Sequence, residues 1–257
     1  MKHLLLFSAL ILGASAAQAE TITDLSGWST DGSGEWTYDA PTNTWHQHIN
    51  TPTSAFLYDS EGASLGNAIT GNISVDTAGD DDLIGFALGY EQGDHANPDA
   101  DYFLLTWRQA AQSGMGEGLY MWHIQGSIDD GSVWNPNTHA AMTQIGTAKS
   151  LSTTGWDDFV NYTFDISYDT NILSVFINDS LEFALTSKDA GVDQFTDGSF
   201  AFFNFSQNDV TYGGVTVDAM QNVLDDDKLE DIAEAVPFHG AYAASLLLGL
   251  FAWRRKA

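Results

Sequence analysis

The chain of 257 residues contains no cysteine. This absence excludes disulfide bonds, thiol nucleophiles and thiolate metal ligands, so the folded state depends on its hydrophobic core, with or without a bound metal ion. Aromatic residues make up 12% of the chain. A body of about 200 residues with that many large apolar side chains can bury a sufficient core as a single domain.

Positive charge is also scarce. Between positions 20 and 235 the basic residues are Arg108, Lys149, Lys188 and Lys228, whereas the chain carries 35 acidic residues and a net charge of -27. Such a surface repels the phosphate backbone, which excludes nucleic-acid binding, and it attracts cations. Only eight of the acidic residues are glutamate. The excess is aspartate, which favours turns and metal-binding loops over helices.

The N-terminal segment has the pattern of a signal peptide. Lys2 precedes an apolar run over residues 4–13, and residues 17–19 (Ala-Gln-Ala) supply the small side chains that signal peptidase requires. The apolar run is too short to span a bilayer as a permanent helix. We therefore predict that residues 1–19 are removed on export, with cleavage before Glu20.

The C-terminal segment predicts insertion into a membrane. An apolar stretch over residues 241–253 is followed by Arg-Arg-Lys at residues 254–256. Cations just beyond an apolar helix remain on the cytoplasmic side, so the sequence predicts a C-terminal apolar transmembrane helix in this orientation. A plain membrane anchor is one interpretation of this tail.

The same tail, residues 236–257, also carries a Val-Pro pair ahead of its apolar stretch and a basic end. In this it resembles the PEP-CTERM class of bacterial sorting tails, which an exosortase processes during export. Phe238 and His239 stand where that class usually has Glu-Pro. We expect a protein that is secreted or held at the surface or outer envelope of a bacterium, and transiently anchored in the inner membrane.

The body between the two ends alternates apolar and polar residues in the manner of β-strands. Such period-two burial directs one face to a core and the other outward. Turn-forming residues separate the runs, and no amphipathic helix lies between them. The pattern predicts an all-β protein, an antiparallel sandwich or jelly roll. The strands are expected at residues 84–90, 103–107, 160–168, 173–177, 181–185 and 200–205.

After Val217 the pattern changes to apolar residues at helical spacing among acids. We therefore end the β-rich body, residues 20–218, at this point. Residues 219–235 are predicted to form an acidic spacer, helical or disordered, ahead of the tail. Asp225, Asp226 and Asp227 lie in this spacer and are expected to be solvated.

Four short motifs follow one another in the body. Residues 80–90 read DDDLIGFALGY, residues 101–110 read DYFLLTWRQA, residues 155–159 read GWDDF, and residues 205–207 read FSQ. This order resembles the C-terminal domain of thrombospondins, which shows DDD-x-x-GF-x-x-GY, FY-x-x-x-W-K-Q, GW-K-D-F and FSQ-E in turn. The similarity covers residues 28–218.

The resemblance implies a concanavalin-like, L-type lectin β-sandwich that binds calcium and works in extracellular adhesion. The family's cysteines are absent here, as are the Asp-rich repeats that precede this domain in animal thrombospondins. Asp157 stands at a position that is basic in the family, and Asn208 replaces the Glu that follows Phe-Ser-Gln. Surfaces that bind animal receptors are therefore not transferred to this chain.

The strongest candidate for a metal site is the aspartate triplet, Asp80, Asp81 and Asp82. Adjacent carboxylates repel one another where water is partly excluded, and Ca2+, which prefers several oxygen ligands in a flexible loop, relieves that repulsion. In the resemblance these positions match the family's calcium-associated aspartates. In an extended strand Asp81 would point away from its two neighbours, so one ion could contact all three only at a bulge. A solvated acidic turn is the alternative.

Other candidate ligands depend on how loops fold. Asp99 and Asp101 would join the calcium site if their loop lies beside the triplet, or else they form plain surface. Asn208 and Asp209, in the turn after Phe-Ser-Gln, are weaker candidates.

Two histidines are spaced i, i+2 on a predicted strand, so His46 and His48 share one face. That spacing can bind zinc, but a third ligand is needed, and no further histidine or cysteine lies nearby in the sequence. We interpret both as polar residues of an exposed face.

Aromatic residues cluster around two of the predicted strands. Lectin-like sandwiches often use an aromatic ring as a platform for a sugar, so we select Trp107, Trp122 and Trp134 as possible ligand-binding residues. Packing in the core is the alternative for each of them.

No catalytic motif is present. A glycosidase of this fold needs two carboxylates facing each other across a groove, and the Glu-x-Asp-x-Glu strand pattern is missing, as are a Gly-x-Ser-x-Gly elbow and a zinc-binding helix. The sequence predicts a non-catalytic, calcium-binding adhesion module for extracellular matrix or exopolysaccharide. A lectin-like domain for the cell's own exopolysaccharide is the second hypothesis, and a polysaccharide hydrolase or lyase the third.

Overall fold

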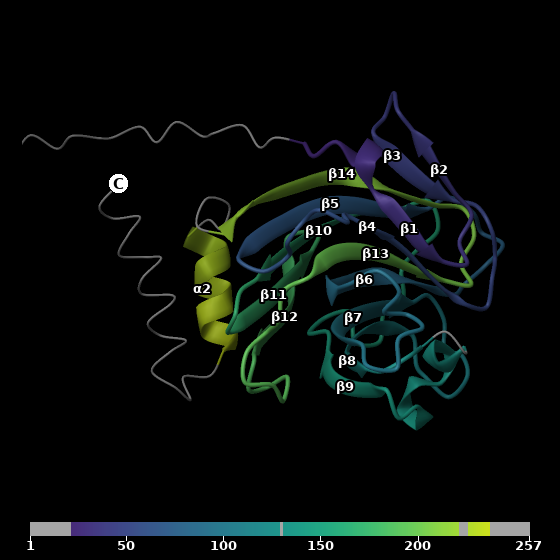
Figure 1. Ribbon diagram of the computed structural model, residues 1–257. Helices are drawn as coiled ribbons and strands as arrows, with labels where there is room; N and C mark the ends of the chain where they lie inside the picture. The colour runs from purple at the N-terminus through teal and green to yellow at the C-terminus, as the bar shows by residue number, and fades with distance from the viewer. Residues whose placement is uncertain (1–21, 129–130, 221–225, 237–257) are drawn as a thin grey trace, which may run out of the picture.

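The computed structural model describes residues 22–128, 131–220 and 226–236 (Figure 1). The predicted signal peptide and nearly all of the predicted sorting tail lie outside the described residues. Within the described ranges, no helix has the length and apolar character needed to cross a membrane.

The described strands form two seven-stranded sheets, and every pairing within each sheet is antiparallel. Sheet I has the order β1-β4-β13-β6-β7-β8-β9, and sheet II has the order β12-β11-β10-β5-β14-β3-β2. The strands of sheet I are β1 (Ser29–Gly32), β4 (Ser54–Tyr58), β6 (Leu83–Tyr90), β7 (Asp101–Arg108), β8 (Gly118–Gln125), β9 (Met142–Thr147) and β13 (Ser199–Phe205). Those of sheet II are β2 (Trp36–Asp39), β3 (Thr44–Gln47), β5 (Asn67–Val75), β10 (Asn161–Tyr168), β11 (Ile172–Ile177), β12 (Ser180–Thr186) and β14 (Val210–Ala219).

The main core lies between the two sheets. Alternating residues of each strand point into it, so that Phe86 of sheet I meets Phe164 of sheet II with ring centroids 4.5 Å apart. Burying such aromatic side chains provides most of the driving force for folding in the absence of disulfides. The all-β sandwich predicted from the period-two pattern is therefore confirmed, and each strand expected from that pattern is present.

The outer face of sheet I is also buried, which gives the molecule a second apolar cluster. Tyr102, Leu104 and Trp122 lie on this face and are covered by the loops that precede β7 and β9. The two loops are joined where the N–H of Ile128 donates to the carbonyl of His95 at 2.8 Å. They include the short 3-10 helices η2 (Ser132–Trp134) and η3 (Pro136–Thr138); a third, η1 (Leu25–Gly27), precedes β1.

One α-helix, α2 (Asp226–Ala235), lies within the predicted acidic spacer. Figure 1 shows it beside the ends of β11 and β12. Leu229 and Ile232 pack there against Phe176 and Leu181 in a third apolar cluster. Part of the predicted acidic spacer is therefore a helix, one of the two alternatives, and it is docked on the outer face of sheet II, where Lys228 also forms an ion pair with Asp165.

Candidate cation and ligand site

The aspartate triplet lies in the loop between β5 and β6, at one end of the sandwich. The segment is not extended strand: β5 ends at Val75, and β6 begins only at Leu83. Strand alternation therefore does not apply to the triplet. Each of its three carboxylates offers an oxygen, and these oxygens all lie within 4.8 Å of one another. The expected conflict in direction is thus absent, and one ion could contact all three.

Asp80 is held by two segments distant in sequence. Its Oδ2 atom accepts a hydrogen bond from Nδ2 of Asn50 at 2.8 Å and another from the backbone N–H of Asn208 at 3.3 Å. Burial raises the pKa of Asp80 to about 6, and the charge of Asp82 adds to the rise. The carboxylate thus lies where its negative charge is disfavoured unless a cation is near.

Asp82 is the buried member of the triplet, with 6% of its surface exposed. Its N–H donates to Oε1 of Gln207 at 2.8 Å, and its carbonyl accepts from Nε1 of Trp156 at 3.3 Å. Burial raises the pKa of its carboxyl, against side-chain hydrogen bonds from Ser206 and Gln112 that lower it. The contacts with Gln207 and Trp156 hold the β5–β6 loop in place through both backbone groups of Asp82.

The glycine of the Gly155-Trp156 motif is required by a close backbone contact. Gly155 passes so close to β7 that a Cβ atom there would lie 1.9 Å from the carbonyl oxygen of Gln109. Only glycine allows this approach, which carries Trp156 to the triplet loop.

Asp81, the exposed member, is bonded to a third loop. Nε2 of Gln112 donates to its carbonyl at 2.7 Å and to its Oδ1 atom at 3.0 Å. At this loop end the carboxylates of Asp80 and Asp81 thus accept hydrogen bonds from the side-chain amides of Asn50 and Gln112 and from the backbone N–H of Asn208. Carboxylate oxygens are ligands that Ca2+ prefers, so the triplet can hold that ion.

The structure does not bring Asp99 and Asp101 to the triplet. In the β6–β7 pair it is Arg108 that lies opposite Leu83, and Asp101 is at the other end of β7. Asp101 and Arg108 are seven positions apart along β7, a distance of about 24 Å. Asp101 instead bonds His123 Nε2 at 2.6 Å. Their assignment to the same calcium site was therefore wrong.

Trp107 and Trp122 are not positioned for sugar stacking, because each is only 1% exposed. Trp107 lies in the core between the sheets and donates through Nε1 to the carbonyl of Thr154 at 2.9 Å. Trp122 lies under the loops on the outer face of sheet I and donates to Thr106 at 2.9 Å. Core packing, the alternative, holds for both.

Trp134 is only partly buried, and it lies near the triplet. Its ring meets Phe205 edge-on at 5.2 Å and lies 5.9 Å from the guanidinium carbon of Arg108. Both of those residues pair with Leu83, the residue that follows Asp82. Trp134 thus shares one end of sheet I with the triplet.

Sequence reasoning missed the role of Arg108, which is 1% exposed. Its Nη2 atom donates to the carbonyls of Val133 at 2.6 Å and Trp134 at 2.9 Å, and so holds the η2 loop on the sheet. Burial lowers its pKa to about 10, partly offset by the charges of Tyr120 and Asp82. The scarcity of basic residues in the body was the one signal that could have singled it out.

Comparison with known proteins identifies the fold. No family model and no curated protein matches the sequence. Among solved structures, the chain is similar to a protein of unknown function with a galectin-like fold from Bacillus subtilis, with a TM-score of 0.54 and 10% identity over 76% of this chain and 90% of that one. It is also similar to the carbohydrate-binding module CBM66 from Bacillus subtilis, with a TM-score of 0.50 and 13% identity over 75% of this chain and 95% of that one.

A third similar structure is a proposed glycosyl hydrolase from Parabacteroides distasonis, with a TM-score of 0.50 and 12% identity over 77% of this chain and 90% of that one. Together these similarities show that the chain is a lectin-like β-sandwich, as expected. The finer resemblances, to thrombospondins and to PEP-CTERM tails, stay predictions.

Proposed function

We propose that the chain is a non-catalytic carbohydrate-binding module in which a calcium ion at the aspartate triplet forms part of the ligand site. One observation carries the proposal: a cluster of oxygen ligands and an accessible aromatic ring share one end of a lectin-like sheet. The triplet precedes β6, and Trp134 packs on Phe205, which pairs with the first residue of β6.

The chemistry of this end suits a sugar. A sugar presents hydroxyl groups that need fixed hydrogen-bond partners and an apolar face that packs on an aromatic ring. The carboxylates of the triplet and the side-chain amides of Asn50 and Gln112 provide such hydrogen-bond partners, and Trp134 provides the ring. An oxygen-coordinated Ca2+ with a remaining ligand position can also accept sugar hydroxyls.

The charge of the chain narrows the ligand class. A net charge of -27 repels sulfated or uronic-acid polysaccharides at long range. We therefore expect a neutral polysaccharide as the ligand. A similar fold in a carbohydrate-binding module supports the proposal without identifying the sugar.

Adhesion at the bacterial surface is the setting we propose for this binding. Its support lies in the sequence patterns of the two ends: a signal peptide at residues 1–19 and a membrane-inserting tail at residues 236–257, open to an exosortase-type enzyme. The cell's own exopolysaccharide or the surrounding matrix is the partner that this setting suggests.

Hydrolysis is the second candidate, because the raised pKa of Asp80 would suit a general acid. A glycosidase places its two carboxyl groups about 5 to 9.5 Å apart on opposite sides of the bond to be cleaved. The triplet oxygens all lie within 4.8 Å of one another on a single loop. Glu182, which is buried, is instead bonded to Ser150 and to the backbone of Leu151. This arrangement favours binding over cleavage.

A glycan array tests the proposed function. With Ca2+ present, the full-length chain should bind neutral oligosaccharides and should not bind sulfated ones. In a separate assay it should release no reducing ends from a bound polysaccharide. An array that stays blank at high protein concentration would contradict carbohydrate binding. Release of reducing ends would instead support the hydrolase.

A further inference from the structure

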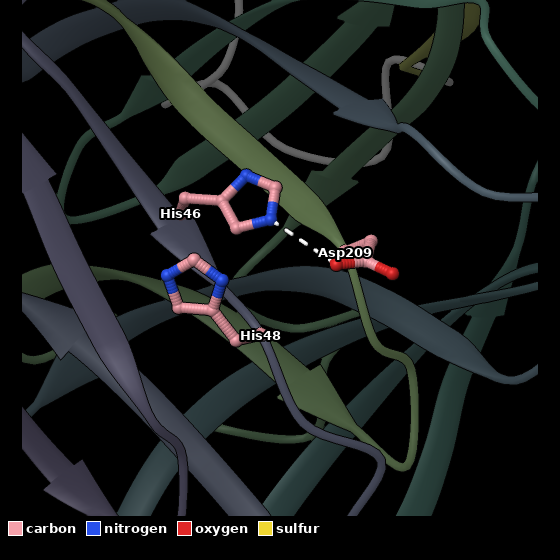
Figure 2. A group of neighbouring side chains, drawn as sticks. All are labelled: His46, His48 and Asp209. Carbon is pink, nitrogen blue, oxygen red and sulfur yellow. Dashed lines mark hydrogen bonds and ion pairs between the residues drawn. The ribbon is translucent and has the colours of Figure 1, made fainter.

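Sheet II carries on its outer face a second group of side chains that could hold a metal ion, distinct in composition from the aspartate triplet. His46 lies on β3, and His48 follows the end of that strand. Asp209 immediately precedes β14, the neighbour of β3 in the sheet. Figure 2 shows these three side chains, the histidine cluster, directed toward one another. The two imidazole centroids are 4.4 Å apart.

The hydrogen bonds of His46 fix which of its nitrogens is free. The hydroxyl of Thr211 donates to Oδ2 of Asp76 at 2.6 Å. Its single proton is thereby used, so at 3.1 Å from Nδ1 of His46 it must accept from an N–H there. In the neutral ring, Nε2 is then left with a lone pair.

That lone pair faces a negative charge. Nε2 of His46 lies 3.4 Å from Oδ1 of Asp209. Two acceptors at this separation repel one another unless a cation lies between them. The cation is either a proton on Nε2 or a metal ion bound by both atoms. The contacts of His48 and Asp209 favour a metal ion over a proton.

In both His48 and Asp209, a polar atom that points away from the centre of the cluster forms a hydrogen bond, and the other polar atom points inward. Nε2 of His48 bonds the hydroxyl of Thr37 at 2.9 Å, and Figure 2 shows the other ring nitrogen turned toward His46 and Asp209. Oδ2 of Asp209 accepts from Nδ2 of Asn208 at 2.9 Å, which leaves Oδ1 directed inward. Metal ligands characteristically have such outer partners, which orient the ring or carboxylate and fix its tautomer.

We propose that His46 through Nε2, His48 through Nδ1 and Asp209 through Oδ1 form a three-ligand site for a divalent transition-metal ion of the zinc type. Tetrahedral zinc at about 2.0–2.1 Å from nitrogen and oxygen ligands places neighbouring ligand atoms about 3.4 Å apart. The ligand atoms of the cluster lie within 4.8 Å of one another, and one pair is already at 3.4 Å. A rotation of the exposed His48 ring closes the remaining difference.

Ligand chemistry separates this site from the triplet. Two imidazole nitrogens select zinc-type ions, whereas Ca2+ takes oxygen ligands. His48 is exposed and the Asp209 side chain is 40% exposed, so the fourth position opens to solvent. A water molecule or a donor atom from outside the chain can occupy it. The site does not depend on sugar binding, so either can fail alone.

Calorimetric titration of the untagged full-length chain with Zn2+, in saturating Ca2+, tests the site. We expect one zinc ion per chain, with the affinity lowered at least tenfold by His48→Gln and by Asp209→Asn. His139→Gln, outside the cluster, should leave zinc affinity unchanged. Equal affinity in His48→Gln and the wild type, both folded by circular dichroism, would overturn the proposal.

Nitrogen-15 NMR of the histidine rings distinguishes a metal from a proton. On adding Zn2+, the signals of His46 Nε2 and His48 Nδ1 should shift to values of metal-bound nitrogen, while the other nitrogen of each ring stays protonated. If both nitrogens of His46 are protonated and their signals do not shift on adding Zn2+, a proton accounts for the contact with Asp209 and the metal site is excluded.

Discussion

The backbone N–H of Asn208 lies 3.3 Å from Oδ2 of Asp80, while its side-chain amide donates to Asp209 at 2.9 Å. A single residue in the turn after β13 therefore contacts both the aspartate triplet and the histidine cluster. This contact also ties the β5–β6 loop to the start of β14, since Asp209 directly precedes that strand. An ion that fixes the triplet loop would restrain this turn as well.

Calcium should stabilise the folded chain, because it relieves repulsion among three carboxylates that the unfolded chain does not bring together. At a concentration 100 times Kd the gain is about 2.7 kcal/mol. For a domain of this size we expect the Tm to rise by roughly 5–10 °C. Differential scanning calorimetry in Ca2+ and in chelator measures the shift.

Asp81→Asn should reduce that calcium-dependent shift to less than half, since Asp81 is an exposed ligand whose loss leaves the fold intact. Asp227→Asn in α2 is the matched control, with the same loss of charge on an exposed residue away from the triplet. An unchanged Tm in chelator for the wild type, or equal shifts in both variants, would count against calcium at the triplet.

The metal-free chain should lose stability as the pH rises through about 6. The folded pKa of Asp80 lies above its unfolded value of 3.8, so the folded state binds the proton more tightly than the unfolded state. This contribution to stability is complete below about pH 4 and is lost as the pH rises through the folded pKa. The raised pKa of Asp82 acts in the same direction.

Urea unfolding in chelator between pH 4 and 7 checks this sign. Asp80→Asn should give a flatter dependence of unfolding free energy on pH than the wild type, and Asp227→Asn should not. A wild-type chain whose metal-free stability rises over this window more steeply than that of Asp80→Asn would refute the assigned shift.

Arg108 should be a major contributor to stability, because its guanidinium donates to two carbonyls of the η2 loop while buried. Arg108→Met leaves those carbonyls without their charged donor, but it also removes a buried charge whose Nη1 atom has no hydrogen-bond partner, so it should lower the free energy of unfolding by about 1–2 kcal/mol. Urea unfolding measures the loss. Lys149→Met, at an exposed position, should change it by less than about 0.5 kcal/mol. Similar losses in the two variants would show that Arg108 does not anchor the loop.

The alternation of residues in the body predicted six strands correctly, β6, β7, β10, β11, β12 and β13, because one face of each packs in the core; β5 and β14, central in sheet II, were not predicted. Strands β2 and β3 were harder to predict, since each has only four residues and the inward face of β3 carries a buried polar residue, Gln47. The apolar–polar alternation also does not reveal which tryptophan side chains are exposed. Trp107 and Trp122 point to opposite faces of sheet I, and loops distant in sequence cover the outer one.

The candidate site was predicted only where it is local in sequence. The aspartate triplet is contiguous, so its composition indicated a cation site, whereas Asn50 and Asn208 join it from loops far along the chain. Asp101 was considered a ligand on the condition that its loop lies beside the triplet, but in the antiparallel β6–β7 pair the two strands begin at opposite ends. For the histidines, the missing third ligand, Asp209, is 163 residues away from His46.

Trp134 should contribute to sugar affinity, since it is the one selected tryptophan whose ring is not fully buried. Trp134→Ala should weaken binding of a neutral oligosaccharide roughly two- to tenfold, as expected for loss of about 0.5–1.5 kcal/mol of aromatic packing. Titration calorimetry measures the change. Phe159→Ala removes a ring that is 68% exposed elsewhere and should have no effect. Equal affinities for Trp134→Ala and wild type would remove this residue from the site.

The calcium dependence of oligosaccharide affinity tests the central claim most directly. A neutral oligosaccharide selected on the array is titrated into the full-length wild type and Asp81→Asn, each in Ca2+ and in chelator. We expect binding by the wild type in Ca2+ that chelator abolishes, and binding by Asp81→Asn that is weakened even in Ca2+. Equal affinity of the wild type with and without Ca2+ would contradict a carbohydrate site built around the aspartate triplet.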